Sequence, residues 1–124
     1  MLAAAELTAF VPTTDLERAR AFYGGTLGLE LESVNEFACV FRSAGTMLRV
    51  TKVSGFDPQR FTVLGWAVPD IYATARELTD AGIPAVRYEG VEQDDDGVWA
   101  NPDGVRVLWF KDPDGNTLSI AQYG

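Results

Sequence analysis

The chain has 124 residues, of which 47% are hydrophobic and 23% charged, a composition typical of one globular domain and not of a disordered chain. It contains no histidine, which excludes Ser-His and Cys-His nucleophile pairs, histidine general bases and the common zinc and iron ligand sets. The formal net charge of −8 disfavours nucleic acid and anionic membranes as partners, and it permits a cationic ligand.

The cellular setting is indicated by the cysteine content and by the N-terminal residues. Cys39 is the only cysteine, so no internal disulfide can form, and we expect a reduced, cytoplasmic environment. Its hydrophobic neighbours favour a small buried side chain over a nucleophile. The first residues lack a basic start and reach Glu6 before any long apolar run, so we expect no secretory signal. No stretch approaches about 20 apolar residues, so we expect no membrane span.

The first half of the chain predicts a strand, a helix and three strands. Apolar and polar residues alternate over 6–11, which indicates a strand. Thr14 and Glu17 fit a capping box at the start of a helix, and Gly28 is placed to end that helix. Further strands are expected over 29–34, 37–42 and 46–53, followed by a connector over 54–60.

The second half repeats this order. A strand over 61–68 precedes a helix that begins near Asp70 and ends at Gly82. The stretch 90–104 contains the turn signals DDDG and NPDG, so we expect it to be irregular. Strands are expected near 84–88, 105–111 and 117–122. The order β-α-β-β-β, connector, β-α-β-β-β is therefore an internal repeat.

The repeat predicts the fold class. Each module has one helix to cover one face of its strands, so the other face needs the second module, a partner subunit or a ligand. We predict one α+β domain in which two βαβββ modules, about 6–53 and 61–122, form a curved mixed sheet around a cavity. The helices lie outside in this arrangement, and Trp66 falls on the face that the second helix covers.

Three segments carry a resemblance to a known family: FVPTTDLERARAFYGGTLGLEL, LGWAVPDIYATARELTDAGI and WFKDPDGNTLSI. They resemble the opening, the second strand–helix unit and the closing aromatic-x-x-D-P-x-G-N turn of the glyoxalase/bleomycin-resistance/extradiol-dioxygenase proteins, the vicinal oxygen chelate superfamily. The resemblance extends from about 6 to 122. It implies the fold described above, a small-molecule ligand in the concave cavity, and a homodimer.

The resemblance also implies where a metal would be held. Metal-using members place His or Glu/Gln side chains at four strand positions, and the matching positions here are Thr8, Arg49, Val63 and Ser119. A divalent metal needs imidazole, carboxylate or thiolate ligands, and these four side chains supply none. We therefore predict a member that lacks the metal ligands and uses no cofactor.

Four of the remaining candidates are expected to line the cavity by strand parity or by position. Phe10 shares a strand face with Thr8. Arg49 is a candidate anchor for an acidic or carbonyl group, and the alternatives are an internal salt bridge or a place at the cavity rim. Trp109 matches an active-site aromatic of the family's dioxygenases and would stack on a planar ligand, unless it is core. Trp99 and the acidic run 94–96 lie in a segment that either folds over the cavity mouth or forms a solvated loop.

These observations predict a metal-independent protein that binds a small molecule in the concave cavity. The alternative is a metal-free enzyme on the same scaffold, with Glu6 or Glu32 as a buried general base, and a glyoxalase or dioxygenase metalloenzyme ranks third. The expected ligand lies flat against Trp109 and Phe10 and presents an acidic or carbonyl group to Arg49. A cationic ligand that faces the acidic run is the competing prediction.

Overall fold

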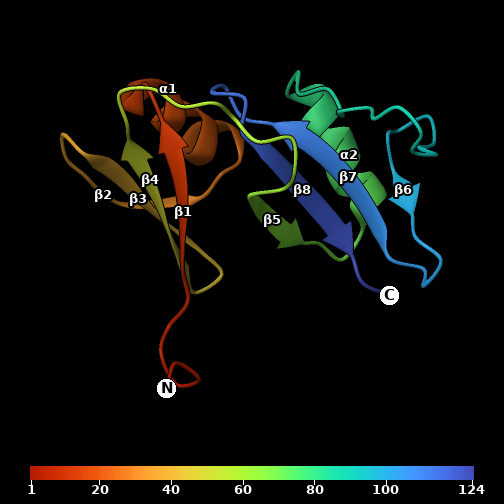
Figure 1. Cartoon of the computed structure of the whole chain (residues 1–124), viewed down its shortest axis with the longest axis horizontal. Helices are drawn as coiled ribbons and strands as arrows, with labels where there is room; N and C mark the ends of the chain where they lie inside the picture. The colour runs from red at the N-terminus through yellow and green to blue at the C-terminus, as the bar shows by residue number, and fades with distance from the viewer. The chain divides into compact units, whose positions relative to one another are not determined.

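A computed structural model describes all 124 residues and divides into two compact units, Met1–Asp57 and Pro58–Gly124. Each unit contains one four-stranded mixed sheet and one helical segment that packs on its own sheet (Figure 1). None of the helices combines the length and the apolar composition that crossing a bilayer requires.

The first unit follows the predicted order of elements. Its sheet has the strand order β1-β4-β3-β2, in which β1 and β4 are parallel and the other neighbours are antiparallel. The predicted strands are present with shifted ends. The elements are β1 (Thr8–Thr13), α1 (Leu16–Arg20), η1 (Ala21–Thr26), β2 (Glu30–Val34), β3 (Ala38–Ser43) and β4 (Thr46–Lys52).

The start of the first helix differs from the prediction by one residue. The N-cap is Asp15 and not Thr14, because Asp15 has extended backbone angles and its carboxylate accepts the N–H of Arg18 at 3.1 Å. Thr14 instead accepts a hydrogen bond from the guanidinium of Arg18 at 3.3 Å. Asp70 caps the second helix in the same way, accepting the N–H groups of the second and third residues after it.

The first helical segment is longer than the second by one residue, and a π-helical turn accommodates the excess. Its final turn, η1, is π-helical, and the N–H of Leu27 donates to the carbonyl of Phe22, five residues back, at 2.8 Å. Gly28 then takes φ +79°, the same value as Gly82 after the second helix. The glycines therefore end both helices as the sequence predicts.

The second unit repeats the arrangement of the first. Its sheet order, β5-β8-β7-β6, matches that of the first unit, with β5 and β8 parallel. This match confirms the internal repeat and the α+β class with two βαβββ modules. The elements are β5 (Leu64–Ala67), α2 (Ile71–Asp80), β6 (Trp99–Ala100), β7 (Arg106–Lys111) and β8 (Thr117–Gln122).

One predicted strand, 84–88, is wrong, and a strand appears where none was expected. Only one backbone bond joins this segment to the sheet, from the N–H of Val86 to the carbonyl of Trp109 at 2.7 Å. The side-chain amide of Gln93 bonds the N–H of Tyr88 and the carbonyl of Val86, both at 2.8 Å. Because a side chain satisfies these backbone groups, the segment does not form a ladder. The strand that pairs with β7 is β6, within the stretch 90–104.

Each helix buries one face of its sheet and leaves the other face open. In the first unit, buried Val11, Phe41 and Leu48 lie on the strand face toward α1. Cys39 belongs to this core, as predicted, and burial raises the pKa of its thiol. Trp66 stacks on Phe110 at 6.4 Å between ring centroids, on the face that α2 covers. Buried residues on that face include Ile71, Ala75, Leu78, Leu108, Leu118 and Ile120.

The DPDGN turn joins β7 to β8 through a buried carboxylate. One oxygen of Asp112 accepts the N–H groups of Asp114 and Asn116 at 3.0 and 2.9 Å. The other oxygen accepts the side-chain amide of Asn116 at 2.8 Å. Gly115 supplies the positive φ, +91°, that closes the turn. This turn sets the register in which Trp109 lies opposite Ser119.

Candidate functional site

The open face of the second sheet brings three predicted site residues together. Trp109 on β7 is the register partner of Ser119 on β8, and Ser119 is the partner of Gly65 on β5. A Cβ atom at Gly65 would lie 2.6 Å from the hydroxyl oxygen of Ser119. The absence of a side chain at Gly65 therefore leaves room for the Ser119 hydroxyl on the open face. Val63 lies just before β5, is 37% exposed and donates its N–H to the carbonyl of Thr117 at 3.0 Å.

Two indoles and a phenol gather on this face. Trp99 on β6 stacks on Trp109 at 6.0 Å between ring centroids and 28° between ring planes. Tyr88 meets Trp109 edge to face at 5.3 Å and 87°. Both tryptophans are half-buried and lie on the sheet face opposite to the one that α2 covers. We call Trp99 and Trp109 the tryptophan pair.

A loop lies beside the tryptophan pair and borders an open cavity. The cavity measures about 590 Å³ and is lined by the tryptophan pair and by Gly90, Val91 and Glu92. The amide of Gln93 holds this loop closed, because it bonds three backbone groups: the N–H of Tyr88 and the carbonyls of Val86 and Gly97, at 2.8–2.9 Å. Sequence reasoning missed Glu92 as a lining residue and Tyr88 as a contact of Trp109, since nothing local distinguishes them from other loop residues.

The connector after Asp57 borders the same unit's open face. Thr117 donates its hydroxyl to the carbonyl of Gln59 at 2.7 Å. Tyr88 donates its hydroxyl to the carbonyl of Arg60 at 3.1 Å. Tyr88 therefore contacts Trp109 with its ring and anchors the connector with its hydroxyl, which fixes the position of the ring.

The acidic run 94–96 does not line this cavity. The carboxylate of Asp94 accepts the hydroxyl of Tyr72 on α2 at 2.6 Å and the backbone N–H of Val98 at 2.9 Å. Desolvation alone would raise the pKa of Asp94, but these hydrogen bonds outweigh it and the pKa is lowered. Asp95 and Asp96 line a separate cavity of about 360 Å³ beside α2. Glu92 is the acid that lines the cavity of the tryptophan pair, and Glu92 and Asp94 both line a neighbouring pocket of about 390 Å³ beside Trp99.

The first unit's open face carries the other predicted residues. Phe10 on β1 is the register partner of Arg49 on β4, and Thr8 lies two residues before Phe10 on the same face. Phe10 is 60% exposed, an unusual exposure for a phenylalanine. Arg49 is half-buried and makes no hydrogen bond or ion pair. Its other register partner is Val40, so apolar side chains flank its stem on both sides.

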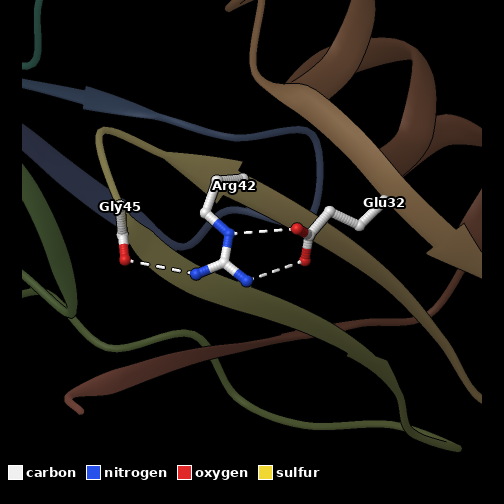
Figure 2. Close-up of polar contacts among 3 residues, drawn as sticks. All are labelled: Glu32, Arg42 and Gly45. Atoms are coloured by element: carbon white, nitrogen blue, oxygen red, sulfur yellow. Dashed lines mark hydrogen bonds and ion pairs between the residues drawn. The ribbon is translucent and has the colours of Figure 1, made fainter.

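The carboxylate of Glu32, a candidate general base, is occupied by an arginine. Arg42 donates from Nε and from one terminal nitrogen to the two carboxylate oxygens of Glu32, both at 3.1 Å (Figure 2). A second terminal nitrogen donates to the carbonyl of Gly45 at 3.2 Å. The hydrogen bond to Glu32 is the main cause of a raised pKa at Arg42. This bidentate geometry holds Glu32 as an ion-pair partner.

The residues at the family's metal positions do not fit a metal. Thr8 and Arg49 belong to the first unit, and Val63 and Ser119 belong to the second. Two hydroxyls, one guanidinium and one aliphatic side chain do not form a divalent ligand set. The structure also contains no group of three or more His, Cys, Asp or Glu side chains close enough to hold a metal ion.

Two βαβββ units with identical strand order, each with one face covered by a helix, define a two-module α+β protein with open sheet faces. A sequence profile of the Glyoxalase/Bleomycin resistance protein/Dioxygenase superfamily matches residues 5–120. The chain belongs to this superfamily, which confirms the family predicted from its sequence motifs.

Solved structures share the fold over almost the whole chain. A superfamily member from Sphaerobacter thermophilus has a TM-score of 0.76 and 24% identity, with 99% of this chain and 100% of that chain covered. A lactoylglutathione lyase from Agrobacterium tumefaciens has a TM-score of 0.74 and 16% identity, with 96% and 93% covered. A glyoxalase family protein from Enterococcus faecalis has a TM-score of 0.70 and 18% identity, with 98% and 99% covered. No curated protein sequence matches the chain significantly. At these identities the structures show the fold alone.

Proposed function

We propose that this protein binds a small molecule without using a metal and that the ligand lies against the tryptophan pair. The observation that carries the proposal is the stacked pair itself, half-exposed on an open sheet face beside a cavity of about 590 Å³. Ligand cavities in proteins measure roughly 300–1,000 Å³ and are lined mainly by aromatic and apolar groups with a few polar ones. This cavity has that size and that lining.

Metal independence is the second part of the proposal, and the donor chemistry supports it. None of the four side chains at the family's metal positions is a carboxylate, an imidazole or a thiolate. Protein purified without chelator should therefore contain well under one equivalent of zinc, nickel, iron or manganese by elemental analysis. A stoichiometric metal bound among Thr8, Arg49, Val63 and Ser119 would contradict this part.

Candidate ligand contacts are proposed separately for the open face of each unit. In the second unit they are Trp99, Trp109, Ser119 and Val63, where Ser119 offers a hydroxyl beside Trp109. On the first unit's open face they are Thr8, Phe10 and Arg49. The unpaired guanidinium of Arg49 is suited to an acceptor group, such as a carbonyl.

Calorimetric titration of flat aromatic probes tests the proposal. We expect binding to the parent protein and a loss of about ten- to a hundredfold in Trp109→Ala, because stacking on an indole contributes about 1–3 kcal/mol. Trp66→Phe is the matched control, since Trp66 stacks on Phe110 on the helix-covered face and should leave binding unchanged. Equal losses in both variants, or no binding to the parent, would overturn the proposal.

Arg49→Met tests the contribution of the first unit. A probe that carries a carbonyl or carboxylate beside its aromatic ring should lose about tenfold or more in affinity, the cost of one charge-assisted hydrogen bond. Arg42→Met serves as the control, because Arg42 is engaged by Glu32. If Arg49→Met leaves this probe unaffected, Arg49 is not a ligand contact.

We also propose a homodimer in the cytoplasm. Each unit's sheet ends in edge strands, β1 and β2 in one and β5 and β6 in the other, and edge strands favour association. Sedimentation equilibrium at tens of micromolar should give about twice the mass of the chain, and a monomer mass would contradict the proposal. The absence of any cysteine besides Cys39 supports a reducing compartment.

A further inference from the structure

We infer that the ligand group seated against the tryptophan pair is a flat organic cation, such as a protonated or quaternary nitrogen heterocycle. This inference rests on the proposed function, because it assigns a charge to the ligand of that same cavity. It differs from the expectation, drawn from Arg49, that the ligand presents an acidic or carbonyl group to the protein.

The cavity lining carries one charge, and that charge is negative. Glu92 lines the cavity together with Gly90, Val91 and the tryptophan pair, and no lysine or arginine does. The carboxylate of Glu92 makes no hydrogen bond or ion pair, in contrast to Glu32, which Arg42 engages twice. A cation at the tryptophan pair therefore meets an available counter-charge.

The indole faces favour the same sign of charge. Aromatic rings carry negative charge density on their faces, and tryptophan attracts cations most strongly. Trp99 and Trp109 stack on each other, 28° from parallel with centroids 6.0 Å apart, so a flat ligand would extend this stack by lying against an outer indole face. A planar cation thus gains both stacking area and electrostatic attraction.

No basic residue is among those that line the cavity. Lys111 shares the open face with Trp109 but lies two residues after it on β7. Trp99 lies toward the other end of β7, because it pairs with Val107, two residues before Trp109. Arg87 lines the separate cavity beside α2 and donates to the carbonyl of Asp95 at 2.9 Å. The overall charge of −8 adds a field that attracts cations.

Three probes of similar size and different charge test the inference. N-methylquinolinium is a permanent cation, quinoline is neutral at pH 7.5, and 2-naphthoate is an anion. Titrated by calorimetry into the parent protein, the cation should bind about tenfold more tightly than quinoline, and naphthoate should bind most weakly. Raising the salt concentration should weaken binding of the cation and leave quinoline unchanged.

Glu92→Gln separates the carboxylate from the aromatic contribution. The variant should bind the cation about three- to tenfold more weakly and bind quinoline as the parent does. Glu89→Gln is the matched control, because Glu89 is exposed on the same loop and does not line this cavity, so cation binding should change less than twofold. Both substitutions are isosteric and exposed, and unchanged unfolding midpoints verify that the fold is intact.

The outcomes distinguish the two proposals. If quinoline or naphthoate binds at least as tightly as the cation, and Trp109→Ala abolishes that binding, the cation inference is wrong while the proposed binding function stands. The same holds if Glu92→Gln and Glu89→Gln affect the cation equally. If no probe binds in a way that depends on Trp109, the binding function itself fails, and the inference fails with it.

Discussion

Gln93 should control the loop that lies beside the tryptophan pair. Its side-chain amide accepts the N–H of Tyr88 and donates to the carbonyls of Val86 and Gly97, at 2.8, 2.8 and 2.9 Å. Gln93→Leu keeps the size of the side chain and removes all three bonds. A hydrogen bond contributes about 0.5–1.5 kcal/mol net, and Gln93 is only half-buried, so we expect local opening of the loop to become easier by about 2 kcal/mol.

Amide hydrogen exchange measures this opening directly. A change of about 2 kcal/mol corresponds to a roughly 30-fold loss of protection at the amide of Tyr88. Binding of N-methylquinolinium should weaken by much less than 30-fold, because affinity falls only as far as the closed, binding-competent fraction of molecules falls. Gln59→Leu is the control, since the connector uses the backbone carbonyl of Gln59 and not its side chain. Unchanged protection at Tyr88 in Gln93→Leu would refute this reasoning.

Further substitutions test the loop, the closing turn and the acid range. Gly97→Ala should destabilise the protein by about 3 kcal/mol in urea unfolding, because φ is +90° and the new methyl would lie 2.4 Å from a facing side chain. Gly90→Ala, with φ +83° and open space, should cost only about 1–2 kcal/mol. Asp112→Ala removes a buried carboxylate that accepts three hydrogen bonds and should cost about 2–4 kcal/mol by the same measurement. The lowered pKa of Asp94 stabilises the fold above the unfolded-state pKa, about 4, and this contribution disappears as the pH falls through the folded-state pKa. Asp94→Asn or Tyr72→Phe should therefore weaken the pH dependence of the unfolding midpoint between pH 2 and 6. An unaltered pH dependence would contradict this role of Asp94.

Sequence patterns determined those features that depend on neighbouring residues. Asp70 and the glycines at 28 and 82 mark helix ends because caps act through backbone groups within one or two turns. Alternation along the strands placed Trp66 on the helix-covered face. The duplicated order of elements was sufficient to predict the fold class, and three motif segments carried the resemblance to the family. The error at the first helix start, Thr14 in place of Asp15 as the N-cap, arose because both residue types favour that position.

Only the tertiary structure decided what surrounds the tryptophan pair. The sequence predicted Trp99 and Trp109 as site residues, but their stacking depends on β6 pairing with β7 in one register. Glu92 lines the cavity because of the path that the loop takes. Gln93 sets this path, since its side chain bonds backbone groups five to seven residues away and so prevents the strand expected over 84–88. Such side-chain bonds within loops have no periodicity, whereas helices and strands repeat their contacts at a fixed spacing that a sequence displays. The sequence was therefore sufficient to predict the fold, whereas the charge at the cavity depends on the path of the loop that places Glu92 there.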